Sequence, residues 1–163
     1  SRGLVGSEMC IRDRLTTIVN AWEEAGFTSK GFEDIQQLIW EKFICNVAYS
    51  GPCSVFKKTI GEILNDKDMT EVSIQCALEA RKLGDLKKIN FSFDNTEKYI
   101  IDFGNKMPLS KPSMLQDVEA KRKCELSSIN GMVVTLGKEL NVKTPYNSVV
   151  SNIISAREKE YLQ

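Results

Sequence analysis

The sequence IQQLIWEKFICNVAYS occupies residues 35–50, and its apolar residues recur at the spacing of a helix. The same pattern begins near Phe32 and continues to Gly51-Pro52. We expect this pair to end the helix, because proline has no backbone N–H and its ring clashes with the preceding turn. Apolar side chains lie nearly all round the helix, so we expect it to be buried among others.

One row of polar side chains runs along this helix. Lys42, Asn46 and Ser50 are four residues apart, so they follow one another on one side. A lysine flanked by Ile39 and Phe43 would lose hydration of its charged form, which would make it a proton donor near neutral pH. The structural alternative is a lysine whose stem packs while its ammonium group reaches water, and this is the commoner outcome for long cationic side chains.

Further helical patterns flank the central one. We expect helices over residues 15–26, 68–83, 96–104, 113–140 and from 145 onward. Asp94 or Thr96 could cap the third of these, and Thr144-Pro145 fits the cap-then-proline start of the last. No stretch has the convincing alternation of a strand, so the predicted fold class is an all-α helical bundle.

Residues 113–140 are expected to form the longest helix, begun by a capping box of Ser113 and Gln116. Its apolar stripe includes one acid, Glu125, which would therefore be buried. A buried carboxylate needs a cationic or hydrogen-bonding partner, and Lys42 is the best internal cation. Such a pair is either a structural ion pair or a functional site, and the structural interpretation is the commoner without other information.

Two polar residues lie at the start of the same predicted helix. Ser113 is most simply an N-cap, worth about 1 kcal/mol to a helix. Its hydroxyl could also face a ligand, because free backbone N–H groups and the helix dipole attract anions there. Asp117 lies one turn further on, and in the simplest interpretation it only complements that dipole.

Composition excludes several classes of function. The chain has 163 residues, 42% of them hydrophobic, and its 22 basic and 22 acidic residues cancel, so no basic field would attract nucleic acid or an anionic membrane. The sequence contains no histidine, which argues against imidazole catalysis and mixed Cys/His metal sites, and no metal site is expected. Without any Gly-x-Gly, neither the dinucleotide fingerprint nor a phosphate-binding loop can be placed.

The expected location is the cytoplasm. No apolar run approaches the roughly 18 residues of a membrane span, and the N-terminus has no signal-peptide pattern. Five cysteines, an odd number without any Cys-x-x-Cys, fit a reducing compartment. We expect residues 1–14 to be an adaptor-like or disordered segment, because no periodicity in them continues past Arg14, and residues 15–163 to form one helical domain.

Two blocks of residues resemble the C-terminal domain of ketopantoate (2-dehydropantoate) reductases. The first is Trp40-Glu41-Lys42-Phe43-Ile44-Cys45-Asn46, followed by Gly61-Glu62, and it resembles the family's Trp-x-Lys-x-x-x-Asn pattern. The second is Lys111-Pro112-Ser113-Met114-Leu115-Gln116-Asp117-Val118, then Glu125, Ile129-Asn130-Gly131 and Thr144-Pro145-Tyr146-Asn147. The second block matches the family's Ser-Met-x-Gln-Asp, Glu, Ile-Asn-Gly and Thr-Pro-x-Asn series in order and spacing. Together the resemblance covers about Leu15 to the C-terminus.

The resemblance implies a helical domain, like those of 6-phosphogluconate dehydrogenase-like proteins, that packs against an N-terminal Rossmann domain absent from this sequence. In the family a 2-oxo acid binds between the two domains, and NADPH reduces it to the 2-hydroxy acid on the pathway to pantothenate. Lys42 would donate the proton to the new alcohol. Asn46, Ser50, Ser113 and Asp117 would bind the substrate, and Glu125 would lie where substrate and NADP meet.

Two residues depart from the family pattern. Position 50, often a second asparagine, is Ser50, and a polar residue common before Gly61-Glu62 is replaced by Ile60. A reductase acting on another 2-oxo acid is therefore an alternative. A second alternative is a non-catalytic helical module whose apolar face, normally covered by the Rossmann domain, pairs with a partner or with itself as a homodimer.

Overall fold

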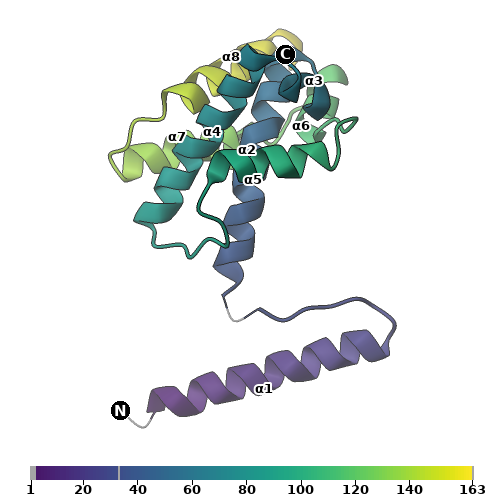
Figure 1. The fold of residues 1–163 in the computed structure, drawn as a ribbon, viewed down its shortest axis with the longest axis vertical. Coiled ribbons are helices and arrows are strands. Elements are labelled where there is room, and N and C mark those ends of the chain that lie inside the picture. The colour runs from purple at the N-terminus through teal and green to yellow at the C-terminus, as the bar shows by residue number, and fades with distance from the viewer. Residues whose placement is uncertain (1–2, 33, 163) are drawn as a thin grey trace. The chain divides into compact units, whose positions relative to one another are not determined.

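The computed structural model describes residues 3–32 and 34–162, with side chains described from residue 13 onward. Every regular element in these residues is a helix (Figure 1), which confirms the all-α fold class. Within the same residues, no helix has the length and apolar character needed to cross a membrane. The chain divides into two compact units, Ser1–Ile35 and Gln36–Gln163, whereas the sequence was expected to divide after residue 14. The domain boundary expected at residue 14 stays a prediction.

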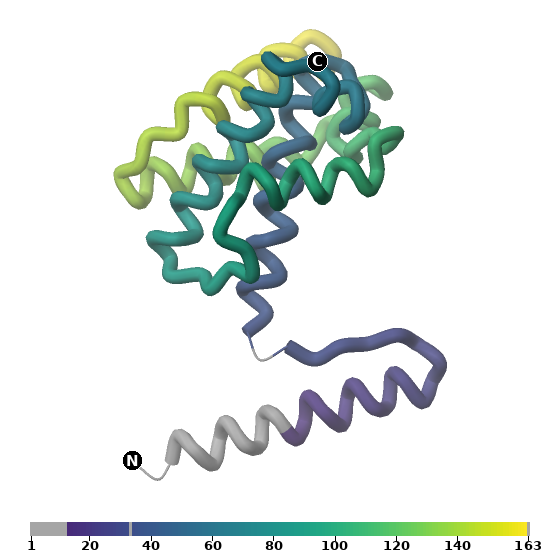
Figure 2. Tube along the Cα trace, in the orientation of Figure 1, coloured from purple at the N-terminus to yellow at the C-terminus, as the bar shows by residue number. Residues whose placement is uncertain are grey.

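The first unit contains helix α1, Gly3–Glu24, which begins well before the expected start at Leu15. Gly26 adopts a left-handed φ of 86°, which ends the helix where the sequence predicted. The chain then turns back along α1 (Figure 2). The Ser29 hydroxyl donates a hydrogen bond of 3.1 Å to the Val19 carbonyl and so holds this return segment.

Helix α2, Ile35–Phe56, is the buried helix predicted from residues 35–50, but it continues through Pro52. The expected end at this proline is wrong. Proline lacks the N–H that would bond the Ala48 carbonyl, and the Ser73 hydroxyl donates to that carbonyl instead, at 2.5 Å. Because the orphaned carbonyl has a partner, the helix tolerates the proline.

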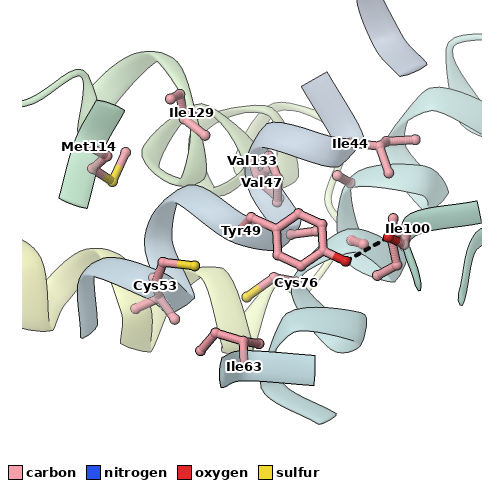
Figure 3. Close-up of a cluster of buried hydrophobic side chains, with 14 of the residues drawn as sticks. Ile44, Val47, Tyr49, Cys53, Ile63, Cys76, Ile100, Met114, Ile129 and Val133 are labelled. Carbon is pink, nitrogen blue, oxygen red and sulfur yellow. Dashed lines mark hydrogen bonds between the residues drawn. The ribbon is translucent and has the colours of Figure 1, made fainter. Parts of the chain in front are cut away.

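Shorter helices surround α2 in the second unit. They are α3 (Ile60–Leu64), α4 (Lys67–Leu86), α5 (Thr96–Asn105), α6 (Ser113–Glu119), the 3₁₀ helix η1 (Leu126–Ser128), α7 (Asn130–Glu139) and α8 (Pro145–Tyr161). Their buried side chains form one core with those of α2 (Figure 3). Within it, the Tyr49 hydroxyl of α2 donates a 2.6 Å hydrogen bond to the Ile100 carbonyl of α5.

Two helix starts differ from the predictions. Helix α3 was not predicted, although Thr59 and Glu62 form a complete capping box at its N-terminus. Helix α5 is capped by the side chain of Asn95, which accepts from the Lys98 N–H, and not by Asp94 or Thr96. In both cases the sequence carried a capping residue of the right type near the observed start.

The long helix predicted over residues 113–140 is wrong, because α6 ends at Glu119 and α7 begins only at Asn130. Lys121 adopts a left-handed φ of 56°, which turns the chain out of the helix. The Cys124 N–H donates a 2.8 Å hydrogen bond to the Glu158 carboxylate of α8. Tertiary bonding thus replaces the helical bonds that a continuous helix would have made.

Candidate active site

The polar row on α2 becomes more buried along the helix. Lys42 is exposed, Asn46 is half-buried and Ser50 is only 4% exposed. Exposure of Lys42 fits the alternative in which its ammonium group reaches water, and the dehydrated lysine is not observed in this chain. Its neighbour Ile39 is also half exposed, so the apolar surroundings that would strip water from the ammonium group are incomplete.

Glu125 does not lie in an apolar stripe. It is exposed and occupies the N-cap position of η1, because the helix that would have buried it is broken. Lys42 and Glu125 are joined by neither a hydrogen bond nor an ion pair in the described part of the chain. The predicted buried pair is therefore wrong, while the catalytic and cofactor roles of the two residues stay predictions.

The capping box expected at Ser113 is also wrong. Pro112 occupies the N-cap position of α6, and no side chain caps this helix. The Gln116 side-chain amide donates instead to the Lys111 carbonyl, at 2.8 Å. Ser113 is exposed at the first position of the helix, so its hydroxyl is open to a ligand.

Asp117 is half-buried one turn into α6 and accepts two hydrogen bonds from the Arg122 guanidinium, at 2.7 and 3.0 Å. This ion pair spans the end of α6. A carboxylate already paired in this way would repel an acidic substrate less than a free one. Its expected part in substrate binding stays a prediction.

An apolar hollow of about 220 Å³ opens between α2 and α7. Its lining residues are Ile39, Trp40, Phe43, Ser128, Met132 and Leu136. Ile39 and Phe43 lie on the same side of α2 as Asn46, seven and three residues before it. The polar row and the hollow therefore share one face of the second unit.

A buried chain of polar side chains was missed in the sequence. The Asn130 side-chain amide donates to the Val47 carbonyl of α2 at 3.0 Å and to the Asn147 side-chain oxygen at 2.9 Å. The Asn147 side-chain amide in turn donates to the Glu79 carboxylate at 2.7 Å and to the Cys76 carbonyl at 3.0 Å. These contacts connect four helices, α2, α4, α7 and α8, through the core.

Glu79 of α4 also caps helix α8. Its carboxylate accepts hydrogen bonds from the Tyr146 N–H at 2.8 Å and from the Asn147 N–H at 3.0 Å. These are free donors of the first turn, where a negative charge also complements the helix dipole. A signal was present, because Glu79 falls between Cys76 and Leu83 on the apolar side of α4, where an unpartnered acid would be costly.

The buried cysteines are not candidates for nucleophilic catalysis. Burial raises the pKa of the Cys45 thiol to about 11, against a smaller lowering by a hydrogen bond with Tyr99. Burial likewise raises the pKa of Cys53 to about 12 and of Cys124 to about 11. Because a thiol reacts as its thiolate, these groups are inert near neutral pH.

The side chains on this face fit a small acid better than a dinucleotide. The Lys42 ammonium group and the Asn46 amide can bond the oxygens of a small acid. The adjacent hollow is almost wholly apolar, and the chain has no Gly-x-Gly to bind a pyrophosphate.

Comparisons with known proteins identify the family of this chain. The family described as "Ketopantoate reductase PanE/ApbA C terminal" matches residues 34–158. A 2-dehydropantoate 2-reductase from Streptococcus pyogenes serotype M3 is 27% identical over 142 residues, covering 86% of this chain and 46% of that protein.

Solved structures share the fold. A PanE/ApbA family ketopantoate reductase from Ralstonia eutropha JMP134 superposes with a TM-score of 0.84 at 19% identity, over 91% of this chain and 49% of its own. D-mandelate dehydrogenase, solved with NADH and anilino(oxo)acetate, gives a TM-score of 0.77 at 21% identity, over 90% and 48%. The chain spans about half the length of the relatives it matches. It therefore belongs to the family of ketopantoate reductase C-terminal domains.

Proposed function

We propose that this chain is the substrate-binding part of an NADP-dependent 2-dehydropantoate 2-reductase, which reduces ketopantoate or a related 2-oxo acid to the 2-hydroxy acid. The observation that carries the proposal is the family match over residues 34–158, which includes the polar row of α2. On this proposal the reaction belongs to pantothenate biosynthesis. The free thiols of Cys45, Cys53, Cys76 and Cys124 support a reducing compartment, the cytoplasm.

In the proposed site Lys42 acts on the keto oxygen. Its ammonium group would polarise the carbonyl, stabilise the developing alkoxide and then give up a proton to complete the alcohol. Asn46 and Ser50 would orient the substrate through uncharged hydrogen bonds, which leaves the charge of Lys42 for the reacting oxygen. Ser113 and Asp117 complete the proposed binding set at the start of α6. When bound, a reduced nicotinamide nucleotide would supply the hydride, and Glu125 is the residue of this chain that would contact it.

The exposure of Lys42 has a simple explanation in this proposal. In the apolar hollow beside it, the side chains of Ile39 and Met132 are 50% and 36% exposed, so apolar surface faces water there. Apolar surface of this kind often marks an interface with another domain or protein. A nucleotide-binding domain placed over this face would cover the hollow and remove water from the ammonium group. Burial of the lysine would then arise only in the complete enzyme.

The test is a fused reductase, in which this chain is joined to the part of the Streptococcus pyogenes relative that it does not cover. NADPH oxidation is measured with ketopantoate. Lys42→Ala should lower kcat at least about 100-fold, the usual contribution of a positioned proton donor. Lys82→Ala, at an exposed lysine of α4, is the matched control and should leave kcat unchanged.

Two results would overturn the proposal. One is full activity of the Lys42→Ala variant, which would remove this lysine from the mechanism. The other is a correctly folded fused reductase that oxidises NADPH with none of a panel of 2-oxo acids. Activity with another acid and none with ketopantoate would correct the substrate, and Ser50 is where this sequence departs from the family pattern.

The second candidate function is a non-catalytic interaction module. The observation that favours it is the same hollow, whose apolar residues could pair with a partner or a second copy. Sedimentation of the isolated chain separates the two functions. A homodimer that Ile39→Asp dissociates would support the module, whereas a monomer at all concentrations would exclude self-pairing.

A further inference from the structure

We propose that Asn130 is a positioning residue for the substrate site, because it fixes the orientation of α2 from inside the core. The inference rests on the proposed function of α2 and adds a residue outside the predicted site. Asn130 is fully buried at the first position of α7, and it bonds the Val47 carbonyl in the middle of the polar row. Lys42, Asn46 and Ser50 project from the helix that this bond holds.

The Asn130 side chain is itself held in place. Its amide is shared between the Val47 carbonyl and the Asn147 side-chain oxygen, which fixes the orientation of the amide plane. Asn147 is locked in turn by the Glu79 carboxylate and the Cys76 carbonyl. A charged group thus ends the chain of bonds, and bonds to charged groups are the stronger ones.

The backbone of α2 is shaped to receive this contact. A Cβ atom at Gly51 would lie 2.5 Å from the Asn130 side-chain oxygen, so only glycine allows the asparagine to approach. One residue on, Pro52 frees the Ala48 carbonyl for the Ser73 hydroxyl. Two consecutive carbonyls of α2 are therefore bonded by side chains from α7 and α4, which resists both rotation and sliding of the helix.

The oxygen of Asn130 has no hydrogen-bond partner among the described residues, although it is buried. An asparagine kept with one atom unsatisfied costs stability that an apolar side chain would not. A requirement for the two N–H donors of Asn130, one bonded to Val47 and one to Asn147, explains why an asparagine occupies this position. A rigidly held α2 keeps substrate groups in place, and small displacements of such groups cost large factors in rate.

The first experiment uses this chain alone and measures amide hydrogen exchange. Asn130→Ala and Asn130→Asp should both speed exchange over residues 46–51 at least about tenfold; the aspartate keeps the size of the side chain but loses both donors. The control is Val133→Ala, at a buried residue of the same helix whose side chain can form no hydrogen bond. In the control, exchange over 46–51 should stay as in the parent chain.

The second experiment uses the fused reductase and separates KM from kcat. Unfolded protein lowers the apparent kcat and leaves KM unchanged, so a merely structural role would not move KM. Asn130→Asp should raise KM for ketopantoate at least about tenfold. Val133→Ala is the control for lost stability, and KM should stay unchanged in it at a temperature where both variants have lost the same amount of Tm. Unchanged exchange over residues 46–51, or an unchanged KM in an active enzyme, would overturn the positioning role. If the parent fused reductase is inactive while exchange responds as stated, the proposed function fails and the anchoring of α2 stands.

Discussion

The close approach of α7 to α2 predicts a large penalty for Gly51→Ala. A Cβ atom there would lie 2.5 Å from the Asn130 side-chain oxygen and 2.6 Å from a Val150 methyl carbon. Overpacking of this kind costs about 2 kcal/mol. Displacing Asn130 would also weaken two buried hydrogen bonds, at about 1 kcal/mol each. Alanine recovers about 1 kcal/mol through its helix propensity, so the expected net loss is about 3 kcal/mol.

Urea denaturation, followed by the helical circular dichroism signal, measures this loss as a change in the free energy of unfolding. A double-mutant cycle then tests its cause. Asn130→Ala removes the atom that the new methyl group meets, so Gly51→Ala should cost at least about 1 kcal/mol less in that background. Equal costs in the two backgrounds would show that the crowding at Gly51 does not involve Asn130.

Three further predictions rest on the described contacts. Glu79→Gln should destabilise the chain by about 1–3 kcal/mol in urea, because it removes a charge from the N-terminus of α8; no loss would contradict the capping role. Burial raises the pKa of Cys45 from 9.0 to about 11 and that of Cys53 to about 12. The unfolded chain therefore releases these two protons at a lower pH than the folded chain does. The free energy of unfolding should keep the full contribution of these thiols below pH 9 and fall from pH 9 towards pH 12. Replacing both cysteines by alanine should reduce the slope of the free energy of unfolding against pH, measured by urea denaturation between pH 8 and 11. An unchanged slope would show that these two thiols are not its cause. The Lys58 ammonium, with help from the Thr59 backbone N–H, lowers the pKa of Glu62 to about 2. Lys58→Ala should therefore raise that pKa towards 4.5 in a carboxyl NMR titration. An unchanged pKa would show that Lys58 does not pair with Glu62.

Local signals in the sequence predicted much of the helical fold. The apolar spacing of residues 35–50 identified α2 as the buried helix, and Thr144-Pro145 marked the start of α8. The apolar pattern of residues 68–83 located most of α4, which is Lys67–Leu86. These elements could be predicted because periodicity and capping are properties of neighbouring residues.

The errors come from long-range contacts. Helix α2 passes through Pro52 because a serine from another helix bonds the freed carbonyl, and no local pattern reports such a partner. The break after α6 had a faint signal, since Arg122 stands four residues after Val118, where a continuous stripe needs an apolar side chain. Its other cause, the bond from Cys124 to Glu158, joins residues 34 positions apart.

The candidate site was predicted by resemblance more than by physics. Periodicity placed the polar row correctly on α2 but could not decide between a dehydrated and a solvent-exposed Lys42. The answer depends on which other helices cover that end of α2. The burial expected for Glu125 failed together with the long helix. The network from Glu79 to Asn130 could not be predicted, since its members lie on three helices and meet only in the folded chain.

A ligand titration on the fused reductase tests whether α2 and the start of α6 together bind the 2-oxo acid. With NADP⁺ present, ketopantoate cannot be reduced, and ¹⁵N NMR can track the side-chain amide of Asn46 and the backbone amide of Ser113. Both signals should shift together with one saturating dissociation constant, and Lys42→Ala should weaken the binding without moving the site. A second apolar pocket lies between α4 and α8 and is lined by Val72, Pro145, Tyr146, Val149 and Val150. Shifts confined to this pocket, with Asn46 unchanged at saturation, would contradict the proposed site.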